Sequence, residues 1–378
     1  MDFALDNMHL AAQQAAEKFA LQYLSPLALE MDIADSFPQD IWQKLGAAHL
    51  LGAGLPEEFG GQGSDVISAA LIGEALAYVS PAFSLSYGAH LNLCAHNLLR
   101  NGTEAQKKAY LPKLASGEWI GALAITEPNI GSDAMGMQCV AQQRDDGFII
   151  NGNKMFITNS PVADLLIFYA KTDTAAGKRG ISAFLLELPA EGFSVSRRLD
   201  KVGMRGSPTG ELRFDNVFVP RQNLLGKLNQ GYKVVMSGLD IERAFLSTIN
   251  LAVMRHCLEI CIDYAALRHK QSTKPQQYDS LIADIYRWQR STRLATYRAL
   301  SLAQQQHRIS KEAALAILTS SEKALRAAEQ TLDLVQLMGF RSENVAQRLW
   351  RDAKLMVIGA GTSEIRRLLI ARELLGQR

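Results

Sequence analysis

The sequence is poor in cysteine, with only four in 378 residues, at Cys94, Cys139, Cys257 and Cys261. No two of them form a Cys-x-x-Cys pair, so the sequence predicts neither a disulfide framework nor a metal site. Cys257 and Cys261 are four residues apart, on one face of a predicted helix, and we expect small core residues there rather than a redox pair. So few cysteines in a long chain fit a reducing compartment, and we expect a cytoplasmic protein.

Strong charge and long apolar runs are lacking too. The 40 basic residues nearly balance the 38 acidic ones, and a net charge of +2 argues against binding to nucleic acid or to a membrane surface. The N-terminus, MDFALDNMHL, has no basic region followed by an apolar run, so we predict no signal peptide. We find no uninterrupted apolar stretch that is long enough to span a bilayer.

What the sequence does contain is two changes of periodicity, which divide it into three domains. Residues 1–121 have the three- and four-residue spacing of helices. Residues 122–228 alternate with period two between turns, which predicts a small β-barrel or sandwich. Residues 229–378 are helical again and begin with one long proline-free helix at 231–268, which predicts a bundle. The pattern is that of the α+β class.

Turn dipeptides and apolar runs locate the strands of the middle domain. Asp146-Gly147 and Asn151-Gly152 are both typical of two-residue hairpin turns. The clearest further strands are predicted at 165–171, 181–188 and 211–220.

Glu242 is the first candidate for chemistry, because an acidic residue here interrupts an apolar face of the long helix. Its neighbours on that face are Gly238, Leu239, Phe245, Leu246 and Ile249. Burial among them would raise the pKa of the carboxyl group, which suits a general base for a weakly acidic proton. The alternative is a structural ion pair, for example with Arg243. The helix pattern alone leaves both open.

Three loops offer polar groups in a form suited to a ligand, although each is also compatible with a purely structural role. Residues 126–133, TEPNIGSD, form a tight turn whose N–H groups can face a ligand. Residues 154–160, KMFITNS, alternate like a strand and place the aromatic Phe156 where it can flank a flat ring. Residues 359–367, GAGTSEIRR, lead into a helix N-terminus.

Two weaker signals favour structure over function. The glycine-rich residues 55–63 lack the spacing and the lysine of a P-loop, so we expect a surface turn. His90 and His96 are six residues apart, which does not place them on one helical face, so we expect packing rather than metal binding.

Taken together, several long stretches resemble the signature sequences of acyl-CoA dehydrogenases, in the order in which that family has them. They are ALAITEPNIGSD, NGNKMFITN, GMRGSPTGELRF, SGLDIERA and RDAKLMVIGAGTSEIRR. The resemblance covers nearly the whole chain, and YGAHLNLCAHNLLRNG together with SGLDIER resembles the isovaleryl-CoA dehydrogenase branch.

The resemblance implies helices at both ends, a β-barrel domain between them, a C-terminal four-helix bundle, and a homotetramer or dimer. It implies FAD, and the flavin contacts would come from Leu123, Ile125, Thr126, Gly131, Ser132, Phe156, Ile157, Thr158, Thr362, Ser363 and Glu364. Contacts to the acyl-CoA substrate would come from Ser132, Asp240, Arg243, Gly359 and Ala360.

The position of the base distinguishes branches of this family. Many members carry it in Glu-Gly-Thr-Ser before the last helix, where this chain has Ala360-Gly361-Thr362-Ser363. The isovaleryl branch uses a glutamate on the long helix, in Leu-Asp-Leu-Glu-Arg, and this chain has Leu-Asp-Ile-Glu-Arg at 239–243. The resemblance therefore makes Glu242 the base.

The implied reaction is the FAD-dependent oxidation of a CH–CH bond. Glu242 would remove the α-proton of a short or branched acyl-CoA while the β-hydride moves to flavin N5, giving a 2-enoyl-CoA. Electrons would pass to electron-transfer flavoprotein, in the catabolism of fatty acids or branched-chain amino acids. Gly359 and Ala360 leave space for a branched acyl group.

The chain departs from the family pattern in two loops that, by resemblance, grip the ADP half of FAD across a subunit interface. Both are shortened, and the cofactor contacts that would carry over are Arg268, Gln276, Gln336 and Gly339. Two alternatives therefore stay open beside the acyl-CoA dehydrogenase. One is a relative that acts on a carrier-protein thioester, and the other is a non-enzymatic scaffold with weakened FAD binding.

Overall fold

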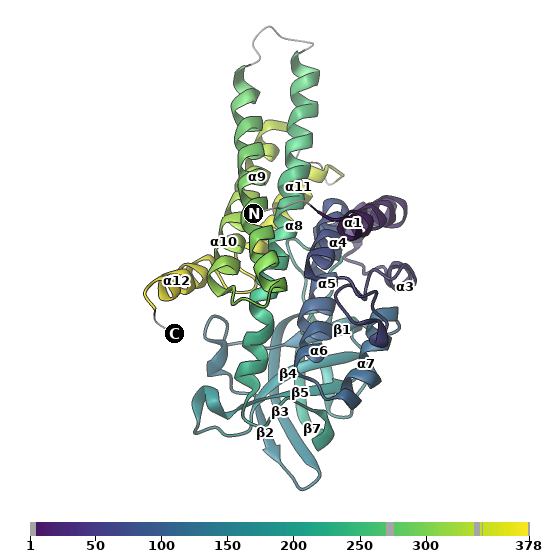
Figure 1. Ribbon diagram of the computed structural model, residues 1–378, viewed down its shortest axis with the longest axis vertical. Coiled ribbons are helices and arrows are strands. Elements are labelled where there is room, and N and C mark those ends of the chain that lie inside the picture. The colour runs from purple at the N-terminus through teal and green to yellow at the C-terminus, as the bar shows by residue number, and fades with distance from the viewer. Residues whose placement is uncertain (1–4, 270–275, 336–340, 342, 377–378) are drawn as a thin grey trace.

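The computed structural model describes residues 5–269, 276–335, 341 and 343–376. Its sheet lies at one end, N-terminal helices pack along one side, and two long helices rise away from the sheet (Figure 1). The order of helix-rich, strand-rich and helix-rich segments confirms the predicted fold.

The N-terminal domain is a cluster of helices in which two short π-helical segments, η1 and η4, interrupt longer helices. The elements are α1 (Asn7–Phe19), η1 (Ala20–Leu24), η2 (Ser25–Leu27), α2 (Ala28–Ala34), α3 (Gln39–Ala47), η3 (Glu57–Phe59), α4 (Val66–Val79), α5 (Pro81–Gly88), η4 (Ala89–Ala95), α6 (His96–Asn101) and α7 (Glu104–Ser116). The caps follow from sequence, since the Asp65 side chain accepts the Ser68 N–H, and Ser80 accepts that of Phe83 before a proline in the first turn.

The middle domain is one eight-stranded sheet with the order β6-β7-β3-β2-β4-β5-β8, and β1 pairs in parallel with β4. The strands are β1 (Gly121–Ala124), β2 (Val140–Gln143), β3 (Gly147–Thr158), β4 (Leu165–Lys171), β5 (Ile181–Glu187), β6 (Phe193–Arg198), β7 (Thr209–Pro220) and β8 (Leu224–Leu225). Short 3-10 turns lie at η5 (Ala134–Gly136), η6 (Ser160–Val162), η7 (Gly177–Gly180) and η8 (Arg221–Asn223). Its core contains Phe168, whose ring packs on those of Phe184 and Phe214.

One of the two predicted hairpin turns is wrong. Asp146-Gly147 lies where β2 turns into β3, as predicted, but Asn151-Gly152 lies inside β3, at a register shift against β7. Gly152 has a φ of 148°, and a Cβ there would lie 2.8 Å from Cys139 Cα, so the glycine marks a bulge under close backbone contact.

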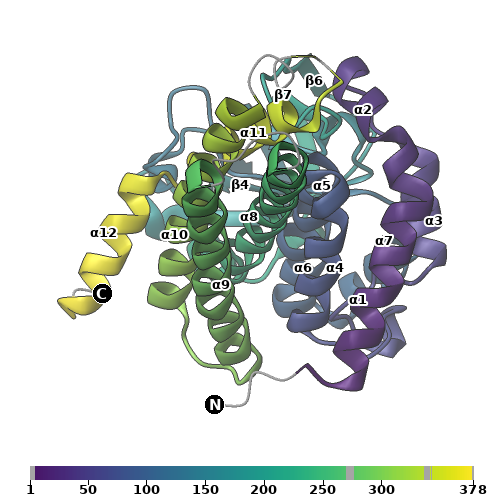
Figure 2. The same cartoon turned by 90° about the horizontal axis from the view of Figure 1, so that it is seen from above.

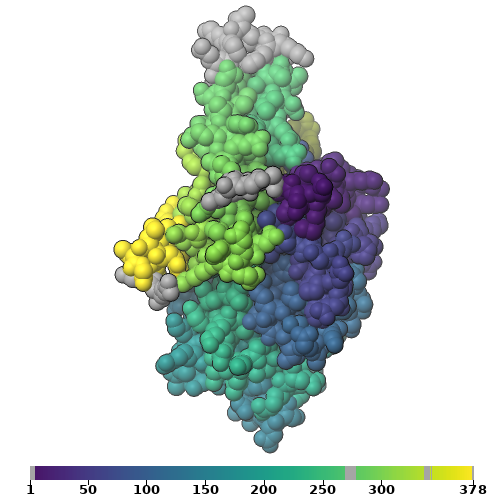
Figure 3. Space-filling view, viewed as in Figure 1, coloured from purple at the N-terminus to yellow at the C-terminus, as the bar shows by residue number. Residues whose placement is uncertain are grey.

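The C-terminal domain consists of α8 (Gly231–His269), α9 (Gln276–Gln304), α10 (Ser310–Val335), α11 (Val345–Met356) and α12 (Ser363–Leu374). Seen from above, α8 runs between α4, α5 and α6 on one side and α9 and α10 on the other (Figure 2). The last helix, α12, projects from the side of the bundle (Figure 3).

The central position of α8 explains its composition. By length and hydropathy, residues 231–268 pass a test for a membrane span, although we predicted no such stretch, but 67% of the most apolar window is buried inside the fold. Cys257 and Cys261 are buried on this helix and carry free thiols, as expected of core residues. We conclude that α8 is the core helix around which the helical domains assemble.

Candidate active site

Glu242 is buried in the first third of α8, with 3% of its surface exposed. Its Oε2 atom has no hydrogen-bond partner among the residues that the structure describes. Burial raises the pKa of the Glu242 carboxyl group to about 7, and the nearby Asn92 amide opposes part of that rise. The alternative of a structural ion pair, with Arg243 or another arginine, is wrong, because no charged group of the described residues pairs with Glu242 and Arg243 pairs with Asp240 instead, at 2.9 Å.

Phe245 fixes the position of α8 against the N-terminal domain, one helical turn after Glu242. Its ring occupies the space left by two glycines, since a Cβ at Gly73 of α4 or Gly88 of α5 would lie 2.4 or 2.5 Å from ring carbons. Helices α4, α5 and α8 are therefore closely packed around the Phe245 ring. That packing orients the turn of α8 from which Glu242 projects.

Asn92 comes from the π-helical segment η4, which packs against α8 and against β1. Its side chain is buried, and Nδ2 has no hydrogen-bond partner within the described part of the chain. A π-helical turn shifts the side chains that follow it, and such turns are common at functional sites. The structure therefore places the amide of Asn92 beside the Glu242 carboxyl group, close enough to lower the pKa of that group, while Oε2 has no partner.

His90, on the same segment, ties the helical domain to the sheet. Its Nδ1 atom accepts the N–H of Gly121 at 2.9 Å, so the other nitrogen, Nε2, carries the proton and donates to Leu114 O at 3.1 Å. Burial lowers the pKa of His90 to about 3, so the ring is neutral. His96 is also buried and bonded to a backbone oxygen, that of Ala53. The expectation that both histidines serve packing is confirmed.

The predicted flavin segments at 123–132 and 156–158 lie side by side. Thr126 O accepts the N–H of Met155 at 2.8 Å, and the Lys154 ammonium lies 2.9 Å from Glu127 Oε1. Leu123, Ile125 and Thr126 are half-buried, whereas the turn at Gly131 and Ser132 is exposed. A Cβ at Gly131 would meet nothing within 4 Å, so this turn is open to a ligand.

Phe156 stands out of the sheet at an irregularity in β3. The pairing of β3 with β7 shifts between Lys154 and Ile157, and Phe156 has a φ of 60° and 61% of its surface exposed. A left-handed backbone conformation is unfavourable for phenylalanine, and so is the exposure of its ring. Backbone strain of this kind is common at ligand-binding sites. Ile157 is buried and Thr158 half-buried beside it. The arrangement suits a ligand with a flat apolar ring.

A third group of predicted residues gathers where α8 meets the turn before α12. Arg243 Nε donates to Ala360 O at 3.2 Å, and Asp240, which pairs with Arg243, also accepts from Ser310 at 2.5 Å. Ala360 has a φ of 56° beside the half-buried Gly359. The structure therefore brings together all four residues of this segment that we assigned to substrate.

The start of α12 forms as predicted. Thr362 caps the helix by accepting the Ile365 N–H at 3.4 Å. Ser363 is buried, and its Oγ has no hydrogen-bond partner in the described part of the structure, while Glu364 is exposed in the first turn. A buried unpaired hydroxyl at a helix start suits a polar ligand edge.

Of the four contacts predicted for the ADP half of FAD, the two that the structure describes are not brought to this site. Arg268 lies near the end of α8, 26 residues from Glu242, which corresponds to about 39 Å of helix, and it bonds to Tyr264. Gln276 begins α9 at the same tip. Gln336 and Gly339 lie outside the described residues. Within one chain, Arg268 therefore does not reach the Glu242 site.

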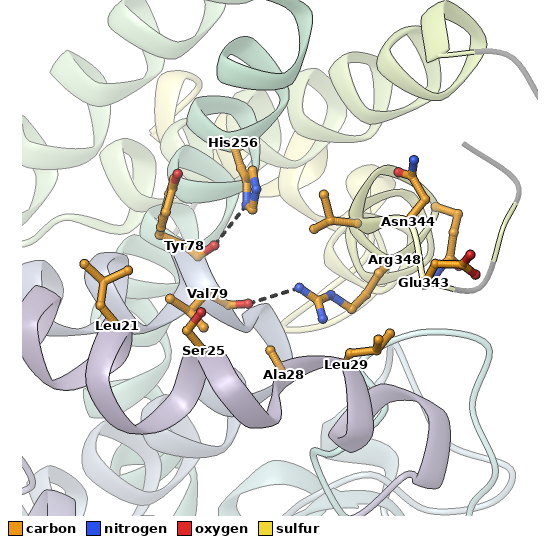
Figure 4. A pocket seen from close by; sticks show the side chains of 12 residues that line it. Leu21, Ser25, Ala28, Leu29, Tyr78, Val79, His256, Glu343, Asn344 and Arg348 are labelled. Carbon is orange, nitrogen blue, oxygen red and sulfur yellow. Dashed lines mark hydrogen bonds between the residues drawn. The ribbon is translucent and has the colours of Figure 1, made fainter. Parts of the chain in front are cut away.

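A cavity of about 240 Å³ lies elsewhere, between the N-terminal helices and α11 (Figure 4). The rings of Tyr78 and His256 stack at 4.8 Å in its wall, and Arg348 donates to Val79 O at 3.3 Å. None of its lining residues belongs to the predicted flavin or substrate set, so we do not assign it to the chemistry. In the part of the chain that the structure describes, no group of three metal-binding side chains occurs.

Comparisons with known proteins decide the family. Models of the N-terminal, middle and C-terminal domains of acyl-CoA dehydrogenase match residues 6–118, 122–217 and 229–375. The chain belongs to the acyl-CoA dehydrogenase family. It is thus an FAD-dependent oxidoreductase that acts on a CH–CH bond of an acyl thioester.

Individual relatives agree with this assignment. Mitochondrial isovaleryl-CoA dehydrogenase of Arabidopsis thaliana is 44% identical over 98% of this chain and 91% of its own length. A mitochondrial 2-methylacyl-CoA dehydrogenase of Solanum tuberosum is 43% identical over the same shares. Among solved structures, butyryl-CoA dehydrogenase of Megasphaera elsdenii has a TM-score of 0.95, with 33% identity, 99% coverage of this chain and 100% of its own. A prolyl acyl carrier protein oxidase, AnaB, has a TM-score of 0.92, with 29% identity and coverages of 98% and 100%.

Sequence reasoning missed three residues that the structure places at the site, namely Asn92, Glu127 and Lys154. The last two were inside the motifs that we singled out, but nothing local showed that they pair. A buried lysine in an alternating strand was the available signal, since a buried ammonium requires a partner. Asn92 lies in the stretch 87–102 that resembles the isovaleryl branch, but nothing marked this residue within it, because a π-helical turn has no simple periodic pattern.

Proposed function

We propose that this enzyme oxidises a short, branched acyl-CoA of the isovaleryl-CoA type to the 2-enoyl-CoA, with Glu242 as the base. One observation carries the assignment of the base. Glu242 is a buried carboxylate with an unpaired oxygen and a pKa raised to about 7, whereas the alternative family position is Ala360. Identities of 43–44% to isovaleryl- and 2-methylacyl-CoA dehydrogenases support the substrate class.

The residues present fit FAD. The exposed ring of Phe156, the open turn at Gly131 and Ser132, and the unpaired Ser363 hydroxyl would hold it, with Leu123, Ile125, Thr126, Ile157, Thr158, Thr362 and Glu364 around them. When bound, FAD supplies the acceptor for the β-hydride. Arg268 and Gln276 would contribute only from a second subunit. Gln336 and Gly339 remain predicted FAD contacts.

The protein itself performs the proton transfer. A thioester carbonyl acidifies the α-proton, and hydrogen-bond donors at that oxygen stabilise the enolate that develops. Glu242 takes the α-proton, and a pKa near 7 gives it both basicity and a large ionised fraction at neutral pH. Ser132 contacts the acyl-CoA, and Asp240 and Arg243 hold its CoA portion or order the base. The small residues Gly359 and Ala360 leave room for the branch.

A panel of acyl-CoA esters tests this proposal. Purified protein loaded with FAD is mixed anaerobically with isovaleryl-, 2-methylbutyryl-, butyryl- and octanoyl-CoA, and loss of the visible flavin absorbance is followed. We expect rapid bleaching by a branched ester and slow bleaching by octanoyl-CoA. Bleaching by octanoyl-CoA faster than by either branched ester would overturn the substrate class.

A second candidate substrate is an acyl chain tethered to a carrier protein. The TM-score of 0.92 to a prolyl acyl carrier protein oxidase favours it, although the identity is only 29%. Under this alternative, flavin is bleached by a carrier-bound acyl thioester and not by any CoA ester of the panel. The non-enzymatic scaffold loses support, because the carboxylate, the flavin-facing segments and the family match are all present.

Partners, location and boundaries complete the proposal. The family membership supports electron-transfer flavoprotein as electron acceptor and assembly as a homotetramer or dimer. A cytoplasmic location remains part of the proposal. The ranges that the family models match, 6–118, 122–217 and 229–375, support domain boundaries at 1–121, 122–228 and 229–378. Light scattering of the FAD-loaded protein tests the assembly.

A further inference from the structure

A buried ion pair joins the two segments that we assign to the flavin. Lys154 of β3 and Glu127 of the loop after β1 lie 2.9 Å apart, with 0% and 6% of their side chains exposed. Lys154 Nζ also donates to Ile125 O at 3.1 Å. One ammonium therefore binds two points of the loop that carries Ile125 and Thr126.

Glu127 closes the same loop from its other end. Its carboxylate accepts the backbone N–H of Gln138 at 2.6 Å and that of Cys139 at 3.0 Å, just before β2. Both ends of the loop that presents Gly131 and Ser132 are thus held by this one carboxylate. Lys154, the other member of the pair, lies on β3 two residues before Phe156, where the pairing of β3 with β7 begins to shift.

Stability alone does not explain a charged pair at this position. Removing two charges from water costs free energy, and an apolar pair of similar volume is often as stable or more so. An apolar pair lacks the directional bonds that are present here, which are charge-assisted and therefore short and orienting. The charged pair therefore fixes the position of the loop at 125–132 relative to strand β3.

We propose that Glu127 and Lys154 are positioning residues that hold loop 125–132 and residues 156–158 in the arrangement that binds FAD. The inference rests on the proposed flavin contacts of these two segments. It predicts that the pair determines cofactor affinity to a greater extent than it determines the stability of the fold.

The test compares single and double substitutions. Lys154→Met leaves a buried carboxylate without its ammonium, whereas Glu127→Leu combined with Lys154→Met removes both buried charges. We expect thermal stability of the apo-protein to fall in the single variant and to recover in part in the double one, which has no unpaired charge but leaves the Gln138 and Cys139 N–H groups without their acceptor. The FAD dissociation constant, measured by quenching of flavin fluorescence, should rise by at least ~10-fold in both, because neither retains the bonds that orient the loop.

The ion pair between Glu74 of α4 and Arg293 of α9, which joins the two helical domains, is a matched control. Arg293 Nη1 lies 2.5 and 2.7 Å from the two Glu74 oxygens, and Glu74 also accepts from Tyr297 at 2.6 Å. Arg293→Met should therefore lower thermal stability. It should leave the FAD dissociation constant within about twofold of wild type, since no flavin segment touches it.

The outcomes separate this inference from the proposed function. Wild-type protein that fails to bind FAD refutes the proposed flavin site. Wild-type protein that binds FAD, with a double variant that binds it equally well, overturns the positioning role of the pair. A double variant that does not fold overturns it too, because the charged pair would then be a requirement of the fold itself.

Discussion

Two buried glutamates, Glu127 and Glu242, differ in whether their carboxylate oxygens have hydrogen-bond partners, and this difference distinguishes a structural role from a catalytic one. They are similarly inaccessible, at 6% and 3% exposed. Glu127 is saturated by the Lys154 ammonium and two backbone N–H groups, whereas Glu242 Oε2 has no partner within the described residues. Buried polar groups are normally satisfied, so a saturated carboxylate is expected where structure is built. An unsatisfied one indicates a group kept available for a reaction.

The same contrast extends to the surroundings of the two glutamates. Glu127 lies in a network of the sheet domain, where each bond fixes a piece of backbone. Glu242 projects from a turn of α8 that is positioned by the packing of Phe245 against the two glycines opposite it. The base is thus oriented by apolar contacts, and its carboxylate keeps its bonding capacity for substrate. Substitutions at each glutamate should therefore have different consequences.

The largest expected effect is the loss of turnover in Glu242→Gln. The amide has the shape of the acid but cannot take a proton, and a general base contributes about 10²–10⁴-fold to rate. We expect turnover of isovaleryl-CoA with an artificial acceptor to fall by ~10³-fold, with FAD binding unchanged. Glu127→Gln should behave in the opposite way, with weaker FAD binding and a smaller loss of rate per bound flavin. Equal losses in both variants would remove the distinction.

Phe245→Ala should be the most destabilising substitution of a residue that touches no ligand. It leaves a cavity between α4, α5 and α8, and such losses cost about 3–5 kcal/mol. Chemical denaturation of the apo-protein measures the change. Gly88→Ala should also destabilise, because its Cβ would lie 2.5 Å from the Phe245 ring. Combined with Phe245→Leu, it should cost less than the sum of the two single changes.

The raised pKa of Glu242 also predicts how stability depends on pH. Because the folded pKa, about 7, exceeds the ordinary value of 4.5, the folded state binds the extra proton between these pH values. Stability is therefore lost as pH rises from about 4.5 to about 7, by as much as ~3 kcal/mol. Glu242→Gln should remove this loss in unfolding curves recorded across that range. Parallel wild-type and variant curves would show that Glu242 ionises normally.

The smallest expected effect is that of Asn92→Ala on the pH profile. In wild type, kcat/KM should rise with pH through about 7 as Glu242 loses its proton. Asn92 opposes the rise in the Glu242 pKa, so its removal should move this limb to higher pH. Asn250→Ala is the control, since Asn250 lies further along α8 and bonds to Ser320 of α10 at 3.0 Å. An unmoved limb in Asn92→Ala would argue against a role for this amide.

Local pattern was enough to predict α8 and the burial of Glu242. The apolar spacing around Glu242 requires that its helical face be covered, whatever covers it. The strand at 165–171 was predicted with the bounds that the structure shows, because its apolar run is covered on both sides. The sequence of three domains followed from changes of period alone.

Other features depend on contacts between distant segments. Asn151-Gly152 has the composition of a hairpin turn, and only its contact with Cys139 and its shifted pairing with β7 show that it is a bulge. Lys154 and Glu127 are 27 residues apart in the sequence. No local rule pairs them, although each belonged to a stretch that we had singled out. Site residues on regular elements were therefore easier to predict than the bonds that hold them together.

Exchange of the α-hydrogen tests the central claim, that Glu242 is the base, most directly. An acyl-CoA analogue with sulfur at the β position has no hydride to lose there, so proton transfer is observed alone. In D₂O, the FAD-loaded wild-type protein should incorporate deuterium at the α-carbon, and Glu242→Gln should not do so above the rate without protein. Deuterium incorporation by Glu242→Gln at the wild-type rate would contradict the account.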